Sequence, residues 1–160
     1  MRQGSSLTEK KAKLIFSQLV EAVRHCHFFW VFHGDLKPDN ILIQTTTEKI
    51  KLIDFGCGKV LQEKEDYTSY SGMKSDMTTS PCYLLGSLMY APPEWFLQSR
   101  YSAVPATVWS LGVILFELLC GHCPFIRTDD IVKVKFKFNR DLSAGDLPFL
   151  HSARPRRDPQ

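Results

Sequence analysis

The spacing of apolar residues near the start of the chain is helical. Apolar side chains recur three or four positions apart at Ala12, Ile15, Phe16, Leu19, Val20, Val23 and Cys26. This spacing places them on one face, which predicts an amphipathic α-helix over about residues 7–27. Ser6 and Glu9 stand three residues apart before this run, in the pattern of a capping box. We expect the helix to begin there.

Two further patterns predict regular structure. The short apolar runs 41–43 and 50–53 are separated by the polar sequence QTTTEK, which predicts two strands joined by a turn. Residues 107–120 are apolar nearly all round, which is typical of a helix buried in the middle of a domain. Gly121 and Pro124 follow, and we expect them to end this helix.

The other segments have different patterns. Residues 62–82 are rich in Ser, Thr, Tyr, Asp and Lys without apolar periodicity, which predicts a long solvated loop. Residues 131–138, IVKVKFKF, alternate apolar with basic side chains, which predicts an amphipathic strand with a lysine face. Residues 143–160 have no periodicity and contain several Arg and Pro, so we expect a disordered tail after one domain over residues 1–142.

Composition narrows the classes of protein. A chain of 160 residues with 44% apolar composition fits one folded domain. A net charge of +3 is too small to indicate nucleic-acid binding. The longest apolar run, residues 108–119, is shorter than the roughly 18 residues of a membrane span, so we expect no membrane partner. The first residues have no apolar stretch typical of a signal peptide, which predicts a protein of the cytoplasm or the nucleus.

The cysteines do not form a recognisable metal or disulfide pattern. There are five, an odd number, and without a secretory signal reduced thiols are expected. The CGHC sequence at residues 120–123 lacks the two further ligands of a structural zinc site. Its position at the end of a predicted helix favours a structural role.

The predicted hairpin brings chemically useful residues together. In an antiparallel pair, Asn40 at the start of the first strand becomes a neighbour of Asp54 at the end of the second. Amide and carboxylate oxygens are ligands that Mg²⁺ takes. Asp35, five residues before Asn40, could accept a proton from an attacking hydroxyl, and Lys37 adds positive charge for a transferring phosphoryl group. These residues predict a phosphoryl-transfer site.

Five sequence blocks, in order, resemble the motifs of one family. HGDLKPDN at residues 33–40 followed by DFG at 54–56 resembles the catalytic and metal loops of protein kinases. GSLMYAPPE at 86–94 resembles the end of a kinase activation loop. VWSLG at 108–112 and GHCPF at 121–125 resemble the central helix of the large lobe and the turn after it. A lysine two places after the aspartate is the serine/threonine form, and the closest resemblance is to the Pim-like kinases.

The resemblance implies a fold, cofactors and residue roles. The expected fold is mainly α with a small β-hairpin, the C-terminal lobe of a kinase, with ATP and Mg²⁺ as cofactors. Asp35 would orient the substrate hydroxyl and Lys37 would contact the γ-phosphate. Asn40 and Asp54 would hold magnesium, and Ser87 could hydrogen-bond Asp35 and Lys37.

Two more residues receive roles from the resemblance. Asp39 occupies a position where an acidic residue meets substrate arginine in basophilic kinases, which implies a protein substrate that carries Ser or Thr near basic residues. His33 is expected to brace the loop from the core, since a histidine beside a buried loop is more often structural than an acid or base.

The sequence also departs from the family pattern. Gly4 is the only glycine before Gly34, so residues 1–33 hold no glycine-rich nucleotide loop, and the resemblance is to the C-lobe without the N-lobe. Gly34 replaces the arginine that commonly pairs with an activation-loop phosphate, so phosphorylation within residues 67–80 would not act through that route. Thr107 stands where most kinases have an aspartate that braces the catalytic loop.

Two functions follow from these features. One is a serine/threonine kinase of which this chain is a truncated catalytic lobe. The other is a non-catalytic binding module, or pseudokinase, that engages kinase partners or substrates. In either case, apolar surface left on the central helix predicts poor solubility or a protein partner.

Overall fold

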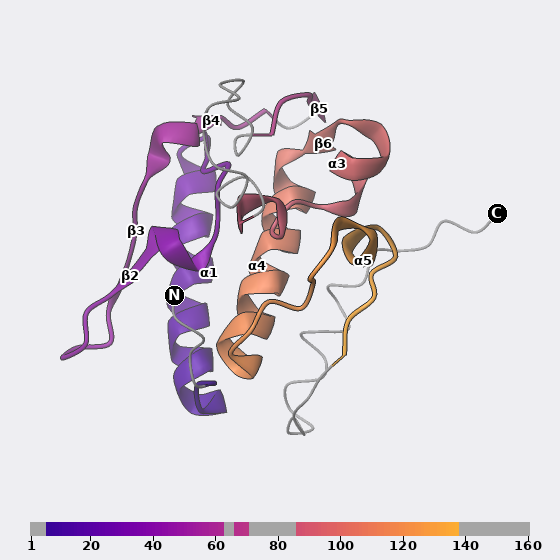
Figure 1. Ribbon diagram of the computed structural model, residues 1–160. Helices are drawn as coiled ribbons and strands as arrows, with labels where there is room; N and C mark the ends of the chain where they lie inside the picture. The colour runs from indigo at the N-terminus through magenta and orange to yellow at the C-terminus, as the bar shows by residue number, and fades with distance from the viewer. Residues whose placement is uncertain (1–5, 63–65, 71–85, 138–160) are drawn as a thin grey trace, which may run out of the picture.

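The molecule is built around two long helices that lie side by side (Figure 1). The computed structural model describes residues 6–62, 66–70 and 86–137. In these residues the long helices are α1 (Glu9–Phe28) and α4 (Ala103–Cys120), and the short ones are α3 (Pro93–Gln98) and α5 (Thr128–Val132). Helices therefore dominate the described structure, as the sequence predicted.

Helix α1 has the predicted apolar face but a different first residue. Its buried side chains are Ala12, Ile15, Leu19 and Val23. The predicted capping box of Ser6 and Glu9 is wrong, because Thr8 is the N-cap and its Oγ1 accepts a hydrogen bond from the Lys11 backbone N–H at 3.3 Å. A threonine hydroxyl satisfies a free N–H of the first turn as well as a serine does.

Helix α4 begins four residues earlier than the apolar pattern predicted. It starts at Ala103 because Pro105 falls in the first turn, where a backbone N–H has no intrahelical partner and its absence costs nothing. The predicted end is confirmed. Gly121 caps the helix with φ 78° and donates its N–H to the Glu117 carbonyl at 2.8 Å. This left-handed conformation suits glycine.

By length and composition, α4 could cross a membrane. A core helix of a globular domain has the same properties, and two observations place α4 in that class. It packs against α1 and β6 (Tyr101–Ser102). It also buries polar side chains, since Thr107 and Ser110 are both at most 6% exposed.

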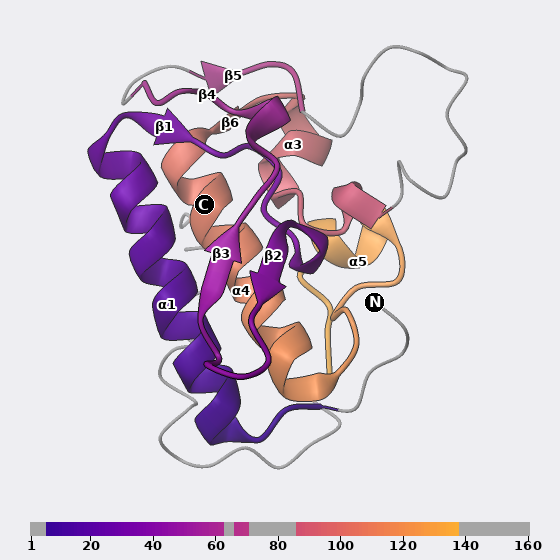
Figure 2. The ribbon, with the colours of Figure 1, turned by 90° about the vertical axis from the view of Figure 1, so that its left-hand side faces the viewer.

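Three two-stranded antiparallel sheets surround these helices. The pairs are β1 (Val31–Phe32) with β4 (Lys59–Val60), β2 (Ile41–Ile43) with β3 (Ile50–Leu52), and β5 (Asp66–Tyr67) with β6. The β2–β3 hairpin was predicted, whereas the other two pairs join segments distant in sequence. The hairpin lies along α1 (Figure 2), where Gln18 binds its turn through the Glu48 carbonyl at 3.0 Å and the Ile50 N–H at 3.3 Å.

Two segment predictions are wrong. The solvated loop predicted at 62–82 is wrong at residues 66–70, which include a strand and in which Tyr67 and Tyr70 are buried. Residues 63–65 and 71–82 of this loop lie outside the described structure. Residues 131–137 form no strand. Ile131 is fully buried in α5, and Val134 has φ 50°, a left-handed conformation that extended strands exclude.

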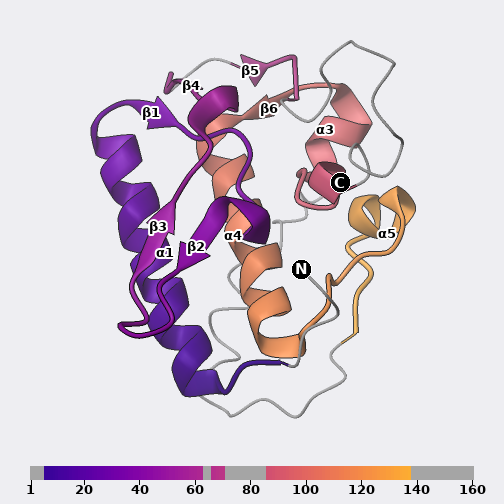
Figure 3. The same ribbon diagram turned by 60° about the vertical axis from the view of Figure 1, so that its left-hand side comes forward.

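The core has two parts. The first fills the space between α1, α4 and α5 and is centred on Leu19, Ile114 and Ile131. The second lies under the strands and α3 drawn at the top of Figure 3 and is rich in aromatic rings, with Phe32, Tyr67, Tyr70 and Tyr101. The loop that bears Asp35 runs between them, since Phe32 belongs to the second part and Leu36 to the first. The predicted tail at residues 143–160 lies outside the described residues.

Candidate active site

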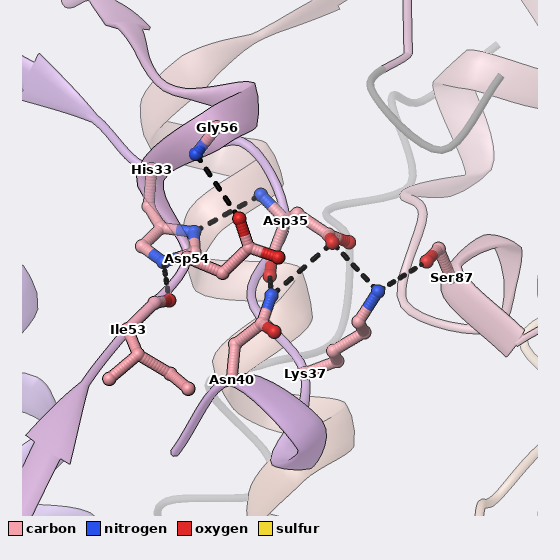
Figure 4. Close-up of polar contacts among 8 residues, drawn as sticks. All are labelled: His33, Asp35, Lys37, Asn40, Ile53, Asp54, Gly56 and Ser87. Carbon is pink, nitrogen blue, oxygen red and sulfur yellow. Dashed lines mark hydrogen bonds and ion pairs between the residues drawn. The ribbon is translucent and has the colours of Figure 1, made fainter. Parts of the chain in front are cut away.

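His33 braces the loop from the core, as predicted. Its ring is 3% exposed, and Nδ1 accepts the Asp35 backbone N–H at 3.3 Å while Nε2 lies 3.0 Å from the Ile53 carbonyl oxygen (Figure 4). Burial lowers the pKa of His33, which favours the neutral ring. With Nδ1 accepting, the proton lies on Nε2 and is donated to Ile53. The loop is thereby tied to the end of β3.

Asp35, Lys37 and Ser87 form a connected polar cluster. The Lys37 ammonium donates to Asp35 Oδ2 at 2.7 Å and to Ser87 Oγ at 2.8 Å. Ser87 lies 50 residues beyond Lys37 in the sequence, yet it is 5% exposed and faces the loop (Figure 4). The predicted bond between Ser87 and Lys37 is confirmed. The link between Ser87 and Asp35 runs through the shared ammonium group.

Asn40 fastens the other end of the same loop. It ends a short 3-10 helix, Pro38–Asn40, and its Nδ2 donates to the Asp35 carbonyl at 2.7 Å and to Asp35 Oδ2 at 3.2 Å. Asp35 Oδ2 therefore accepts from both Lys37 and Asn40. The orientation of the Asp35 carboxylate is determined by two donors on either side of it, which is the preorganisation that a proton acceptor needs.

Asp54 occupies the position that hairpin register predicts. Ile41 pairs with Leu52, and the Ile53 N–H donates to the Asn40 carbonyl at 2.9 Å, so Asn40 and Asp54 meet at one end of the hairpin. Asp54 has φ 61°, and its Oδ1 accepts the Gly56 N–H at 3.3 Å. A Cβ at position 56 would lie 3.1 Å from this carboxylate oxygen, so glycine permits the close turn.

The oxygen atoms at this end suit a magnesium ion. Asn40 uses its Nδ2 to donate to Asp35, which directs its amide oxygen to other partners. Asp54 is exposed, and one carboxylate oxygen receives the Gly56 N–H while the other has no protein bond in the described structure. A carboxylate oxygen of the exposed Asp54 and an amide oxygen of the buried Asn40 match the preference of Mg²⁺ for a few protein oxygens plus waters and phosphates.

The remaining predicted residues lie around this cluster. Asp39 is exposed on the 3-10 helix next to Asn40. Thr107 Oγ1 donates back to the Ala103 carbonyl at 2.8 Å, so it does not hydrogen-bond the catalytic loop as the aspartate expected there would. Gly34, with φ 77°, presents no side chain between the loop and α4.

The CGHC sequence shows no sign of a metal site. Among the described residues, no group of three or more His, Cys, Asp and Glu side chains could hold a metal ion. Burial raises the pKa of the Cys123 thiol to about 11, which keeps it protonated at neutral pH. The structural role of this sequence stays a prediction.

Sequence reasoning missed one residue close to the site. Tyr70 is 6% exposed and lines the same small cavity as Gly34. The polar composition of residues 62–82 concealed it. The only signal was an aromatic side chain in a segment that otherwise predicts solvent exposure.

Comparison with known proteins gives a consistent result. Residues 1–148 match a family model described as the protein kinase domain. The chain is 41% identical over 141 residues to serine/threonine-protein kinase pim-2 of Danio rerio, covering 88% of this chain and 41% of that protein. It is 38% identical over 144 residues to serine/threonine-protein kinase prk-2 of Caenorhabditis elegans, covering 90% of this chain and 28% of that protein.

A third relative is a serine/threonine kinase with a different name. The SNF-related serine/threonine-protein kinase of Rattus norvegicus is 38% identical over 151 residues, which covers 91% of this chain and 18% of that protein. The chain therefore spans less than half the length of each of these three relatives.

Proposed function

This chain belongs to the protein kinase family, and we propose that its site is the C-lobe half of a serine/threonine kinase active site. The proposed reaction is transfer of the ATP γ-phosphoryl group to Ser or Thr hydroxyls of a protein. The observation that carries the proposal is the cluster in which Asp35 Oδ2 accepts from Lys37 and Asn40 while Lys37 also binds Ser87. A scaffold alone has no need for this arrangement.

Each residue has a defined role in this proposal. Asp35 positions the attacking hydroxyl and accepts its proton. Lys37 places positive charge where the transferring phosphoryl group develops negative charge over its oxygens. Asn40 and Asp54 are the residues that would hold magnesium, and the ion would neutralise the nucleotide phosphates when bound. Ser87 holds the Lys37 ammonium beside Asp35.

The protein-substrate side of the site includes Asp39. Its carboxylate is exposed beside the proposed metal ligands. An exposed carboxylate beside a phosphoryl acceptor site attracts basic side chains. We propose that the substrate carries a basic residue near the Ser or Thr that is modified.

A second candidate is a binding module without turnover. Residues 1–33 contain no glycine-rich loop. The described elements also include no second lobe whose strands would cover a nucleotide bound beside Asp54. Phosphoryl transfer depends on the placement of ATP, and little of that placement is present here. We therefore propose that residues 1–142 form the C-lobe alone and that the 160-residue chain by itself binds Mg-ATP weakly.

A thermal unfolding experiment on the 160-residue chain separates these candidates. If the site binds Mg-ATP, the melting temperature should rise as the ATP concentration passes the dissociation constant. At ten times the dissociation constant, binding stabilises the folded state by about 1.4 kcal/mol. The rise should require Mg²⁺ and should disappear in Asp54→Asn. Asp129→Asn removes an exposed carboxylate on α5 and serves as the matched control. No shift with millimolar Mg-ATP would contradict nucleotide binding by this chain and favour the binding module.

A further inference from the structure

The side of the catalytic loop that faces α4 contains unfilled space. Gly34 has no side chain, and a cavity of about 10 Å³ lies between Gly34 and Leu36 of the loop and Thr107 and Ser110 of α4. This is about the volume of one water molecule. The polar groups of α4 are directed elsewhere, since Thr107 donates to the Ala103 carbonyl and Ser110 donates to the Tyr90 and Ala106 carbonyls. Neither of these two hydroxyl groups donates to the loop that carries Asp35.

Tyr70 borders the same space. It lines the cavity together with Gly34 and is 6% exposed. Its ring lies 5.6 Å from the Tyr101 ring in an edge-on arrangement and 5.8 Å from the Trp95 ring. Tyr70 therefore spans from the start of α4 and α3 to the loop that carries Asp35. Aromatic pairs at these separations add specific geometry to ordinary apolar burial.

The residue before Tyr70 is held by three hydrogen bonds. Lys59 Nζ donates to the Ser69 carbonyl at 3.2 Å and to Ser69 Oγ at 2.9 Å. The Tyr101 hydroxyl donates to the same carbonyl at 3.2 Å. The backbone at Ser69 is thus connected to β4 and β6. These bonds fix the position of the backbone from which the Tyr70 side chain extends.

The electrostatic surroundings of Tyr70 favour a neutral ring. Burial, followed by the neighbouring Tyr101 and Asp35, raises the pKa of the Tyr70 hydroxyl. An added negative charge at this position would be buried near Asp35, and the described surroundings offer no guanidinium from position 34 to pair with it.

We propose that Tyr70 is a positioning residue for the Asp35 loop, and that its buried ring, which borders the cavity beside Gly34, holds residues 33–36 against α4. The effect of Tyr70 on phosphoryl transfer rests on the proposed function, whereas the effect of Tyr70 on the loop does not. Tyrosine phosphorylation at Tyr70 would then release the ring and loosen the loop. This is opposite to a switch in which an activation-segment phosphate pairs with arginine and orders the site.

Amide hydrogen exchange measured by mass spectrometry on the 160-residue chain tests this proposal. Tyr70→Ala should increase the exchange rate of the peptide covering residues 33–37 by about tenfold or more, because local opening becomes easier. Tyr70→Phe retains the ring and should stay within about twofold of the parent chain. Equal exchange in Tyr70→Ala and the parent chain would overturn the proposal.

Tyr67→Ala is the matched control. Tyr67 belongs to the same aromatic cluster, with its ring 5.7 Å from Tyr101 and 5.2 Å from Phe32, but it does not line the cavity. Its hydroxyl donates to the Val60 carbonyl at 2.8 Å, so this variant should increase exchange around residues 59–62 more than around 33–37. If both variants increased exchange of 33–37 equally, Tyr70 would be only one of several packing residues and the proposal would fail.

Two further arms keep the test decisive. If Tyr70→Ala unfolds the whole chain, Tyr70→Leu keeps apolar volume without the ring, and it should show faster exchange at 33–37 than Tyr70→Phe. Failure to do so would overturn the proposal. Mg-ATP binding is measured separately by thermal shift, so a loop that responds to Tyr70 in a chain that binds no nucleotide would refute the proposed function while leaving this positioning role supported.

Discussion

The hydrogen bonds of the His33 ring connect its protonation state to the shape of the catalytic loop. Nδ1 accepts from the Asp35 N–H, so a second ring proton would face a donor and break this bond. Burial lowers the His33 pKa, the Lys37 charge adds to this, and the Ile53 carbonyl, Asp35 and Asp54 oppose it. The net direction shows that the fold prefers the neutral ring.

We expect stability to fall in mildly acidic solution because of this preference. The folded pKa lies below the unfolded value of about 6.5, so the stabilisation is present above that value and is lost as pH falls through the folded pKa. Urea unfolding should show a lower free energy of unfolding at pH 5.5 than at pH 7.5 in the parent chain, and a smaller difference in His33→Asn. His27 also has a lowered pKa through burial, so His27→Gln is the control that removes its part. An equal loss in His33→Asn and the parent chain would contradict the assignment.

Trp30 carries backbone strain at the turn between α1 and β1. Its φ is 57°, its carbonyl accepts the Leu61 N–H at 2.7 Å, and its side chain is 54% exposed. The left-handed region costs about 1–2 kcal/mol for a residue with a Cβ. The hydrogen bond and the strand pairing that follows keep the backbone in this conformation.

Trp30→Gly should therefore stabilise the protein. Relief of strain exceeds the extra entropy of an unfolded glycine, so the net gain should be about 0.5–1 kcal/mol in urea unfolding with an unchanged m-value. Trp30→Ala keeps the Cβ and the strain and should not give this gain. A loss of stability in the glycine variant would mean that the exposed indole contributes more than its backbone costs.

At the scale of elements, one hydrogen bond links the segment before α3 to the last turns of α4. The Tyr90 hydroxyl donates to Glu117 Oε2 at 2.6 Å, 27 residues away. Burial raises the Glu117 pKa and the Tyr90 hydrogen bond opposes that change. The carboxylate is partly buried, so this donor replaces part of its contact with water. Tyr90 also packs in the core with Leu111 and Phe125, and its backbone N–H donates to the carbonyl of Ser87, the partner of Lys37, at 3.2 Å.

Tyr90→Phe should destabilise the fold by about 2 kcal/mol, because it leaves a partly buried carboxylate without its donor. Tyr101→Phe removes a hydroxyl that donates to the neutral Ser69 carbonyl, and it should cost only about 1 kcal/mol. Chemical denaturation at neutral pH measures both. Equal costs would show that the charge on Glu117 does not strengthen its hydrogen bond.

At the scale of the whole molecule, apolar surface remains on the outer side of α4. Val104 is 48% exposed and Val108 is 51% exposed, one helical turn apart. The sequence predicted exposed apolar surface on this helix, and these two side chains confirm it. Exposed apolar side chains one helical turn apart favour association or a protein partner.

Replacing both valines should reduce association without loss of fold. Val104→Gln combined with Val108→Gln should lower the light scattering that develops with increasing concentration, while the α-helical circular dichroism stays the same. Leu97→Gln is the control, since Leu97 is 64% exposed on α3 and away from this pair. If the control lowered scattering as much as the double variant, association would not depend on the α4 surface.

The limits of prediction follow from the range of the interactions. The predicted start of α4 was four residues late because of Pro105. A helix accepts proline in its first turn, and the pattern of apolar residues does not reveal this. The predicted strand at residues 131–138 had the correct alternation. However, alternation alone does not distinguish a strand from a short helix whose one buried residue, Ile131, packs against partners distant in sequence.

The sequence by itself determined the elements and residue types that depend on local order. The apolar spacing of α1, the hairpin register that unites Asn40 with Asp54, and the motifs of the kinase family all lie within short stretches of chain. The tertiary structure alone decided the contacts that join distant stretches. Tyr67 pairs with Tyr101 across 34 residues, and Tyr70, from a segment predicted to be solvated, borders the cavity beside Gly34. Such contacts depend on how the helices pack and on which space a missing side chain leaves, and no local pattern records either.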